Sequence, residues 1–355
     1  MLKGNKGEWS EIYTLFKLLS EGNLHSGDVK LNKITDLIYP IIKIIRKEAY
    51  GDFEYIINSN IIIVSGNNKK LEIPITKFQE QTKLILTKIK DTKKGVFSMA
   101  EIETFLEQIN CKTLKAKASV KTDIRIVIHD LKTNTKPELG FSIKSQLGRP
   151  STLFNASKST NFIYEINKQL NNKQIKEINN TKIFVDKFDK LASYGAKLKF
   201  LKIEKAIFKN NLILIDSYLP EIIAHLLELS SISNETSISS LAKKIKELNP
   251  MNYDFEFHHN FYEYKIKHFL TDIALGLMPS KVWKGKYDVT GGYLIIKKNG
   301  DIVAYHIYNK NEFENYLFEN TRLIRASTKR HKFGSIYKEN DKQKIKLNLQ
   351  IRFIK

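Results

Sequence analysis

The sequence predicts an α/β (α+β) fold in which a central mixed sheet is flanked by helices and followed by a β-rich C-terminal unit. Segments 53–75 and 123–145 alternate apolar and polar residues around turn residues, which is typical of β-hairpins. Segments 7–22 and 217–230 instead repeat apolar residues at helical spacing. Short alternating runs return from about Trp283 to the end and predict further strands.

The chain of 355 residues is long enough for two or three domains, and its hydrophobic fraction of 42% is that of a folded protein. We find no internal repeat and no long linker. We expect four regions, namely an N-terminal helix and hairpin region at 1–95, a core at 96–215, a helical region at 216–275 and a β-rich region at 276–355.

The first predicted helix follows Gly7 and ends near Gly22. Its buried stripe consists of Trp9, Ile12, Phe16 and Leu19. Glu8 and Glu11 lie beside that stripe. After it, the runs FEYIINSNIIIVS and KLEIPI flank the turn at 66–68 and predict a β-hairpin.

A second helix is predicted from Ser98, which has capping-box spacing to Glu101, to about Asn110. The next two runs, DIRIVIH at 123–129 and ELGFSIKS at 138–145, are separated by turn residues and predict a second hairpin.

The second half of the chain changes from helices to strands. Segment 183–204 is mixed, whereas 217–230 and 241–249 are helical, the latter ending before Pro250. Segment 291–309 contains an Asn-Gly turn between two alternating runs, and 344–354 alternates as well.

Charge favours a nucleic-acid partner. Lys and Arg number 59 against 38 Asp and Glu, which gives a formal net charge of +21. Such an excess attracts polyanions, although lysine is also simply abundant in a chain this rich in Asn and Ile.

Cys111 is the only cysteine, which excludes an internal disulfide and a cysteine-based structural zinc site. No stretch approaches the ~18 apolar residues of a membrane span, and the first residues lack the apolar core of a secretory signal. We therefore expect a soluble protein of the cytoplasm without a membrane partner.

The hairpin at 123–145 carries the residues with the clearest chemistry. Asp123 begins the first strand on the face opposite Ile124, while Ser142, Lys144 and Gln146 share one face of the second strand. A hairpin brings these faces together. Phosphodiester hydrolysis needs such a pair, because a carboxylate binds Mg²⁺ and a lysine orients the attacking water.

Asp123 and Lys144 resemble the metal-binding Asp and catalytic Lys of the PD-(D/E)xK nucleases. That pattern would place an acid where this chain has Ser142. Members of the superfamily can supply the second acid from elsewhere, and we favour Glu8 or Glu11 of the first helix as catalytic and metal-binding candidates. The alternatives are Glu101, Glu103 and Glu165.

Longer strings resemble the HpaII family of type II restriction endonucleases. They are KGNKGEWSEIYTLFKLL, TDIRIVIHD, GFSIKSQLGRPSTLFNASKSTNF, DVTGGYLIIKK, STKRHKFGSIYKE and LNLQIRF. The resemblance implies a restriction-endonuclease-like fold with its catalytic core at 96–215, double-stranded DNA as substrate, Mg²⁺ as cofactor and a CCGG-type site. A palindromic site favours a homodimer on DNA. A restriction enzyme also implies a cognate DNA methyltransferase.

Two polar segments are predicted to contact DNA. The first, at 148–161, has hydrogen-bonding side chains suited to phosphates and base edges, namely Arg149, Ser151, Thr152, Asn155, Lys158 and Asn161. The second is the C-terminal basic segment with Arg325, Ser327, Thr328, Arg330, His331 and Lys332. Arg330 is the first candidate for reading guanine, because a guanidinium matches the O6 and N7 acceptors, with Arg325 and His331 behind it.

Other functions are alternatives to the restriction nuclease. A non-catalytic DNA- or RNA-binding protein would also explain the charge, and a structure-selective repair nuclease would share the fold. The tripeptide at 258–260 suggests an HNH nuclease, but a surface or packing histidine pair is the better interpretation. The chain has no GxxxxGK[ST] loop, which argues against an ATP-driven enzyme.

Overall fold

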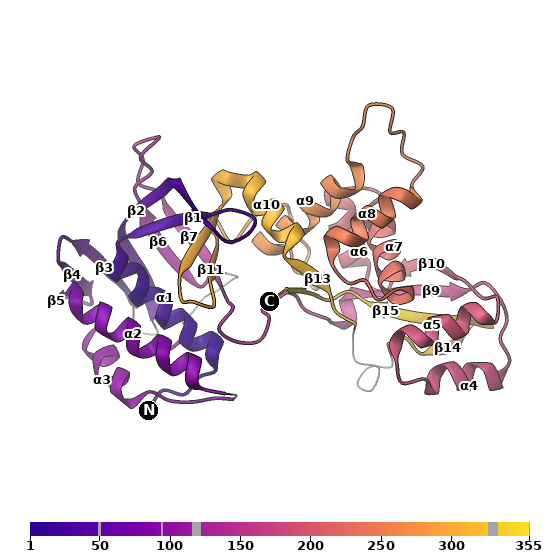
Figure 1. Ribbon diagram of the computed structural model, residues 1–355, viewed down its shortest axis with the longest axis horizontal. Coiled ribbons are helices and arrows are strands. Elements are labelled where there is room, and N and C mark those ends of the chain that lie inside the picture. Colours follow the sequence, from indigo (N-terminus) through magenta and orange to yellow (C-terminus); the bar gives the residue numbers. More distant parts are fainter. Residues whose placement is uncertain (49–50, 94, 116–121, 326–332, 355) are drawn as a thin grey trace. The chain divides into compact units, whose positions relative to one another are not determined.

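The computed structural model describes residues 1–48, 51–93, 95–115, 122–325 and 333–354 (Figure 1). These form two compact units. Unit 1 comprises Met1–Ser151 and Tyr287–Tyr316, and unit 2 comprises Thr152–Lys286 and Leu317–Ile354. The region expected at 276–355 therefore supplies strands to both units.

Unit 1 is built on a nine-stranded sheet in the order β1-β12-β11-β7-β6-β2-β3-β4-β5. The pairs β1–β12 and β7–β11 are parallel and the others are antiparallel, so the predicted central mixed sheet is confirmed. Its strands are β1 (Asn23–Gly27), β2 (Lys33–Glu48), β3 (Gly51–Asn58), β4 (Ile61–Gly66), β5 (Lys69–Pro74), β6 (Ile124–Ile128), β7 (Glu138–Ser145), β11 (Gly292–Ile296) and β12 (Ile302–His306).

Three helices pack together beside this sheet, α1 (Lys6–Glu21), α2 (Ile75–Asp91) and α3 (Ala100–Gln108) (Figure 1). Each contributes one phenylalanine to a cluster of edge-to-face rings, with centroids 5.1–5.5 Å apart, formed by Phe16, Phe78 and Phe105. Such rings bury large apolar areas and fix the three helices against one another. A further helix, α10 (Lys310–Glu319), follows β12 and the short 3-10 turn η2 (Ile307–Asn309).

Helix α1 forms where the sequence predicts it. Asn5 accepts hydrogen bonds from the backbone N–H groups of Gly7 and Glu8, and the Glu8 carboxylate accepts one from the Asn5 N–H. This reciprocal capping box starts the helix. At the other end Gly22 has a left-handed φ of 68°, which glycine adopts without steric cost.

Some local predictions for unit 1 were wrong or incomplete. FEYIINSNIIIVS is two strands, β3 and β4, because Ser59 turns the chain with a φ of 53°. The helix predicted from Ser98 begins one residue later than a capping box requires, with Met99 as its N-cap and no side-chain cap. Strands β1 and β2 and helix α2 were not predicted.

The two hairpins that matter most for the site are confirmed. Strands β6 and β7 pair antiparallel with Ile124 opposite Phe141. Strands β11 and β12 pair antiparallel across the Asn299–Gly300 turn, where Gly300 has a φ of 102°. Strand β11 also lies parallel to β7, which brings Tyr293 opposite Ser142 and Ile295 opposite Lys144.

Unit 2 combines helices with two smaller sheets, ordered β10-β9-β15-β14 and β13-β16-β8. Its helices are α4 (Asn172–Asn180), α5 (Phe184–Ser193), α6 (Ala206–Ile215), α7 (Leu219–Ile232), α8 (Ile238–Leu248) and α9 (Phe261–Leu275). Its strands are β8 (Thr152–Phe154), β9 (Asn161–Ile166), β10 (Leu198–Ile203), β13 (Thr321–Leu323), β14 (Ile336–Glu339), β15 (Lys342–Asn348) and β16 (Ile351–Phe353), with the 3-10 turn η1 (Lys158–Thr160) before β9.

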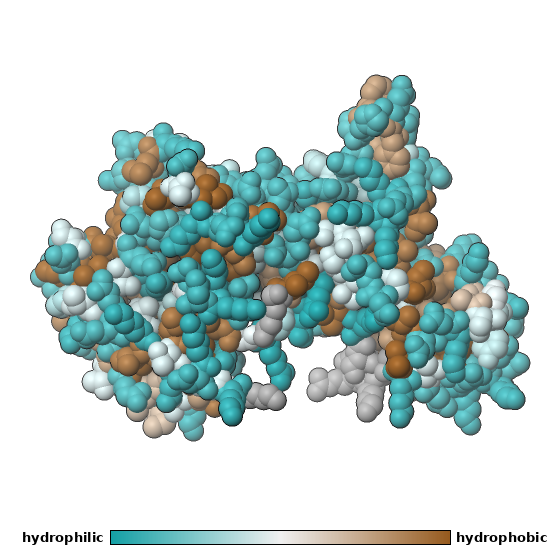
Figure 2. Space-filling model, in the orientation of Figure 1, coloured by the Kyte–Doolittle hydropathy of each residue, from teal (hydrophilic) through white to brown (hydrophobic). Residues whose placement is uncertain are grey.

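The helices predicted around 217–230 and 241–249 are confirmed as α7 and α8, and α8 ends at Asn249 in the left-handed region before Pro250. The visible surface is largely hydrophilic, with small hydrophobic areas between the hydrophilic residues (Figure 2). In the part of the chain that the structure describes, every helix is too short or too polar to cross a membrane.

Candidate active site

Asp123 lies at the start of β6, beside the second strand of its hairpin. Its backbone N–H donates to the carbonyl oxygen of Phe141 at 2.9 Å, which continues the ladder between β6 and β7. Its carboxylate oxygen Oδ2 accepts two further hydrogen bonds, from the Ser142 hydroxyl at 3.0 Å and from the Ile143 N–H at 2.8 Å. Two fixed donors hold this carboxylate in one orientation.

Ser142 occupies the position where the nuclease pattern expects an acid. It is buried, with only 3% of its surface exposed. Its hydroxyl donates to Asp123 instead of facing solvent. In this chain the residue therefore positions the first carboxylate and does not supply a second one.

Lys144 lies two residues further along β7 and is half-buried. Its Nζ lies 5.0 Å from the centre of the Tyr293 ring, which β11 presents beside β7. Burial lowers the pKa of Lys144, the charges of Asp123 and Glu11 oppose that shift, and Lys115 adds to it. The lysine thus lies in the electrostatic field of carboxylates from both β6 and α1.

Helix α1 is fixed against the end of β7. Ser10 donates to the Ser145 hydroxyl at 2.9 Å, and Lys6 donates to the carbonyl oxygen of Leu147 at 3.3 Å. Glu11, half-buried, follows Ser10 directly. Glu8 is used differently, because its Oε2 accepts the Asn5 N–H at 2.8 Å and so caps the helix.

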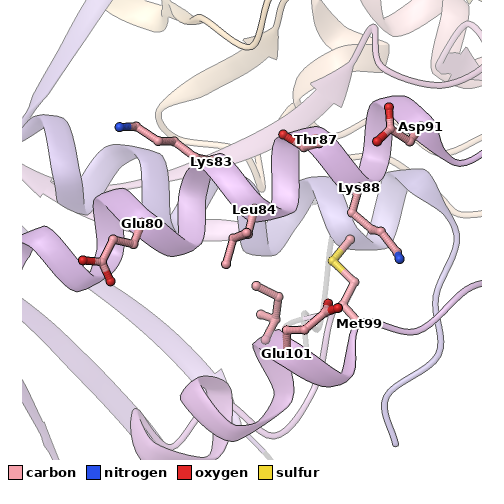
Figure 3. Close-up of a pocket in the computed structure, with 9 residues that line it drawn as sticks. Glu80, Lys83, Leu84, Thr87, Lys88, Asp91, Met99 and Glu101 are labelled. Atoms are coloured by element: carbon pink, nitrogen blue, oxygen red, sulfur yellow. The ribbon is translucent and has the colours of Figure 1, made fainter.

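The other candidate acids, Glu101, Glu103 and Glu165, each contact a different part of the protein. Glu101 lines a pocket of about 670 Å³ between α2 and α3, where it and Met99 face Leu84 and Lys88 (Figure 3). Glu103 pairs with the N-terminal ammonium group at 3.5 Å. Glu165 belongs to unit 2, where it pairs with Lys342.

The residues around Asp123 fit a magnesium ion of the kind that nucleases use. No group of three or more His, Cys, Asp and Glu side chains with metal-ligand geometry occurs among the described residues. This excludes a dedicated protein cage there, but Mg²⁺ is commonly held by one or two carboxylates together with waters and substrate phosphates. An oriented Asp123 carboxylate with Glu11 near the same lysine matches that sparse donor set.

Comparison with known proteins agrees with this chemistry. The model of the HpaII restriction endonuclease family matches residues 5–353. The chain belongs to the HpaII restriction endonuclease family. It is 49% identical over 354 residues to the type II restriction enzyme HpaII of Haemophilus parainfluenzae, a match covering 99% of this chain and 98% of that enzyme. No solved structure gives a significant match.

Membership in the HpaII family confirms the predicted function, a type II site-specific deoxyribonuclease, over the non-catalytic alternative. Double-stranded DNA is the substrate of such enzymes, and they generally use a divalent metal ion. The predicted fold class is confirmed as well. The oriented carboxylate of Asp123 beside β7 marks the candidate site for DNA cleavage by this restriction endonuclease.

The first predicted DNA-contact segment of the HpaII-family enzyme is only partly accessible. Arg149, Asn155 and Lys158 are exposed. Ser151 and Thr152 are half-buried, the former donating to the Ser145 carbonyl oxygen at 3.4 Å and the latter lying in β8. Asn161 is 4% exposed, donates to Glu204 at 2.6 Å and accepts from Asn348, so its side chain is used inside unit 2.

The second predicted segment lies mostly outside the described residues, which include none of Ser327, Thr328, Arg330, His331 and Lys332. Arg325 is described, and its Nη2 donates to the carbonyl oxygens of Ser230 and Ser233 at the end of α7. Those bonds occupy Nη2 of the guanidinium within unit 2. The histidines of the 258–260 tripeptide are exposed, as the surface interpretation predicted.

Tyr293 is a residue of the candidate site that sequence analysis missed. It is 2% exposed, and burial together with the charge of Asp123 raises its pKa. Its strand follows β7 by almost 150 residues, so only the parallel pairing of β7 and β11 reveals it. The resemblance of DVTGGYLIIKK to the family was the one available signal.

Proposed function

We propose that this restriction endonuclease cleaves double-stranded DNA at a short palindromic G·C-containing site of the CCGG type, with Asp123, Glu11 and Lys144 as its cleavage centre. One observation carries the assignment. The Asp123 carboxylate is held by the Ser142 hydroxyl and the Ile143 N–H of β7, the strand that also carries Lys144.

The proposed roles follow from the side chains. Asp123 and Glu11 would hold Mg²⁺, and the Ser142 hydroxyl and the Ile143 N–H fix the orientation of the Asp123 carboxylate. When bound, Mg²⁺ would supply positive charge at the scissile phosphate and make a water ligand more acidic. Lys144 orients the attacking water and offsets negative charge as it develops. Gln146, two residues after Lys144 and just beyond the end of β7, adds hydrogen-bonding capacity.

Glu8 remains the second candidate from α1 for the metal site. We prefer Glu11, because the Glu8 carboxylate already accepts the Asn5 N–H, whereas the charge of Glu11 acts on Lys144. Glu101 and Glu103 are less suited, since each has contacts with α2, α3 or the N-terminus.

We further propose that Arg149, Asn155 and Lys158 contact DNA, and that Arg330 reads a guanine. A palindromic target favours a two-fold dimer, because a C₂ axis presents the same residues to both half-sites. A nuclease of this specificity also threatens the host's own DNA, so pairing with a cognate methyltransferase and a cytoplasmic location belong to the proposal.

The test is cleavage of a sequenced plasmid with Mg²⁺ by the parent protein and by Asp123→Ala and Lys144→Ala. We expect discrete fragments whose mapped ends lie at CCGG, and a loss of at least about 1,000-fold in either variant with DNA binding in Ca²⁺ retained. The exposed pair Asp36→Ala and Lys69→Ala serves as a matched control. Activity within about tenfold of the parent in both site variants would refute the cleavage centre.

A further inference from the structure

A loop between α9 and β11 is held by one buried amide. Asn211 of α6 is 3% exposed. Its Nδ2 donates to the carbonyl oxygens of Met278 at 3.3 Å and Lys281 at 2.9 Å, and its Oδ1 accepts the Trp283 N–H at 3.0 Å. A buried amide with both donor hydrogens and its acceptor in use fixes the path of the chain that it binds.

A second hydrogen bond closes the tip of this loop. The indole N–H of Trp283 donates to the carbonyl oxygen of Lys286 at 2.9 Å. Gly285, between them, has a φ of 73°, a conformation that glycine adopts at no steric cost. Residues 281–286 are therefore held at both ends by hydrogen bonds within unit 2.

The side chains that this loop presents are cationic. Lys281, Lys284 and Lys286 are all exposed, and the sequence has no Asp or Glu from Ile273 to Tyr287. Within the described ranges none of these three ammonium groups forms an ion pair, whereas Lys265 and Lys267 on the neighbouring helix pair with Asp216 and Glu263. The three charges are thus available to an external anion.

We propose that this loop, residues 281–286 anchored by Asn211, is a contact surface for the phosphate backbone of DNA. Lysine is a point charge that suits phosphate oxygens and not the paired acceptors of a base edge. Because the loop is already ordered, its binding to a polyanion costs less conformational entropy than binding by a flexible lysine-rich segment. The loop supplies affinity and does not discriminate between sequences.

The chain then enters the strands of the proposed cleavage centre. Two residues after Lys286, the carbonyl oxygen of Asp288 accepts the Thr122 hydroxyl at 2.9 Å, and Thr122 precedes Asp123. Next, the Gly291 N–H donates to the Gly140 carbonyl oxygen at 2.7 Å. The inference rests on DNA as substrate, but it does not depend on which residues catalyse cleavage.

The test compares a triple variant, Lys281→Gln, Lys284→Gln and Lys286→Gln, with the parent in equilibrium binding to a CCGG duplex without divalent metal, between 50 and 200 mM salt. Each lost phosphate contact should reduce the slope of log affinity against log salt by about 0.9, so we expect a reduction of roughly 2 to 3. Discrimination against a duplex with one changed base pair should stay the same. An unchanged slope, or a changed discrimination ratio, would overturn the proposal.

A matched control removes the same charge elsewhere in unit 2, by Lys173→Gln, Lys176→Gln and Lys182→Gln on the exposed side of α4 and just beyond it. We expect this control triple variant to keep the salt slope of the parent. An equal reduction of the slope in both triple variants would show that net charge alone determines binding and would overturn the proposal. Trp283→Phe keeps all three lysines and removes the closing hydrogen bond, so we expect about threefold to tenfold weaker binding with an unchanged slope. Parental affinity in that variant would refute the role of the fixed loop. These binding results stand even if Asp123→Ala still cleaves DNA.

Discussion

The ammonium group of Lys144 lies 5.0 Å from the centre of the Tyr293 ring, on adjacent parallel strands. A cation over an aromatic face in a desolvated site is stabilised by about 0.5–2 kcal/mol. Tyr293→Leu should therefore lower kcat by roughly tenfold with little change in KM, while Tyr293→Phe, which keeps the ring, should stay within about threefold of the parent. Steady-state cleavage of a short duplex measures both constants. Equal losses in the two variants would show that the ring face does not position Lys144.

Ser142 should affect the Mg²⁺ concentration that cleavage requires, because its hydroxyl donates a hydrogen bond to Asp123. Ser142→Ala removes one of two hydrogen bonds to Oδ2 and leaves the Ile143 N–H in place. Partners of this kind affect metal affinity by about 10–100-fold, so we expect the Mg²⁺ concentration for half-maximal cleavage to rise about tenfold. Ser193→Ala, an exposed serine in unit 2, is the control. A parental Mg²⁺ curve for Ser142→Ala would contradict the positioning role.

Substitutions of Glu11 and Glu8 should affect different properties, namely cleavage activity for Glu11 and folding stability for Glu8. Glu11→Gln should reduce Mg²⁺-dependent cleavage by at least about 100-fold with an unchanged Tm, because a neutral amide is a poor ligand for a hard cation. Glu8→Ala should keep its activity but lose about 1 kcal/mol of stability, because it weakens the capping box with Asn5. Cleavage assays and urea unfolding distinguish the two. The reverse result would assign the second metal carboxylate to Glu8.

The buried side chain of His306 leads us to expect that unit 1 loses folding stability at acidic pH. It is fully buried against the rings of Tyr39 and Phe141, and its Nδ1 accepts the Tyr308 N–H at 3.0 Å. Burial lowers the pKa of His306 to about 4, against a smaller opposing effect of Asp130.

As the pH falls below 6.5, the unfolded chain takes up a proton at His306 before the folded protein does, so the free energy of unfolding decreases between pH 6.5 and about 4. The loss is on the order of 3 kcal/mol. His306→Asn keeps an acceptor near Nδ1 and does not titrate in this range, so its urea-unfolding curve against pH should be flatter than that of the parent. Parallel curves would refute the prediction.

The elements that could be predicted from the sequence are those with local determinants. Helix α1 has a capping box at Asn5 and a glycine at its end, and the hairpin of β6 and β7 has alternating residues around a turn. Asp123 and Lys144 followed from that hairpin, because a two-stranded register fixes which side chains share a face. Helix α2 could also have been found, since Phe78, Ile85 and Ile89 repeat at helical spacing.

Other parts of the site depend on pairing between distant segments. The parallel pair of β7 and β11 joins strands almost 150 residues apart, and no local pattern specifies such a partner. The position of Tyr293 beside Lys144 follows only from that pairing. Burial of Ser142 was missed for a related reason, because β11 covers a strand that would be an accessible edge in an isolated hairpin.

The order of the strands also affects what happens during translation. Strand β11 lies between β7 and β12, yet the ribosome makes it only after all of residues 152–286. A nascent or prematurely terminated chain carries Asp123 and Lys144 without Tyr293 and without the strand beside β7. We therefore expect incomplete chains that end before β11 to lack the strand that completes the proposed cleavage centre.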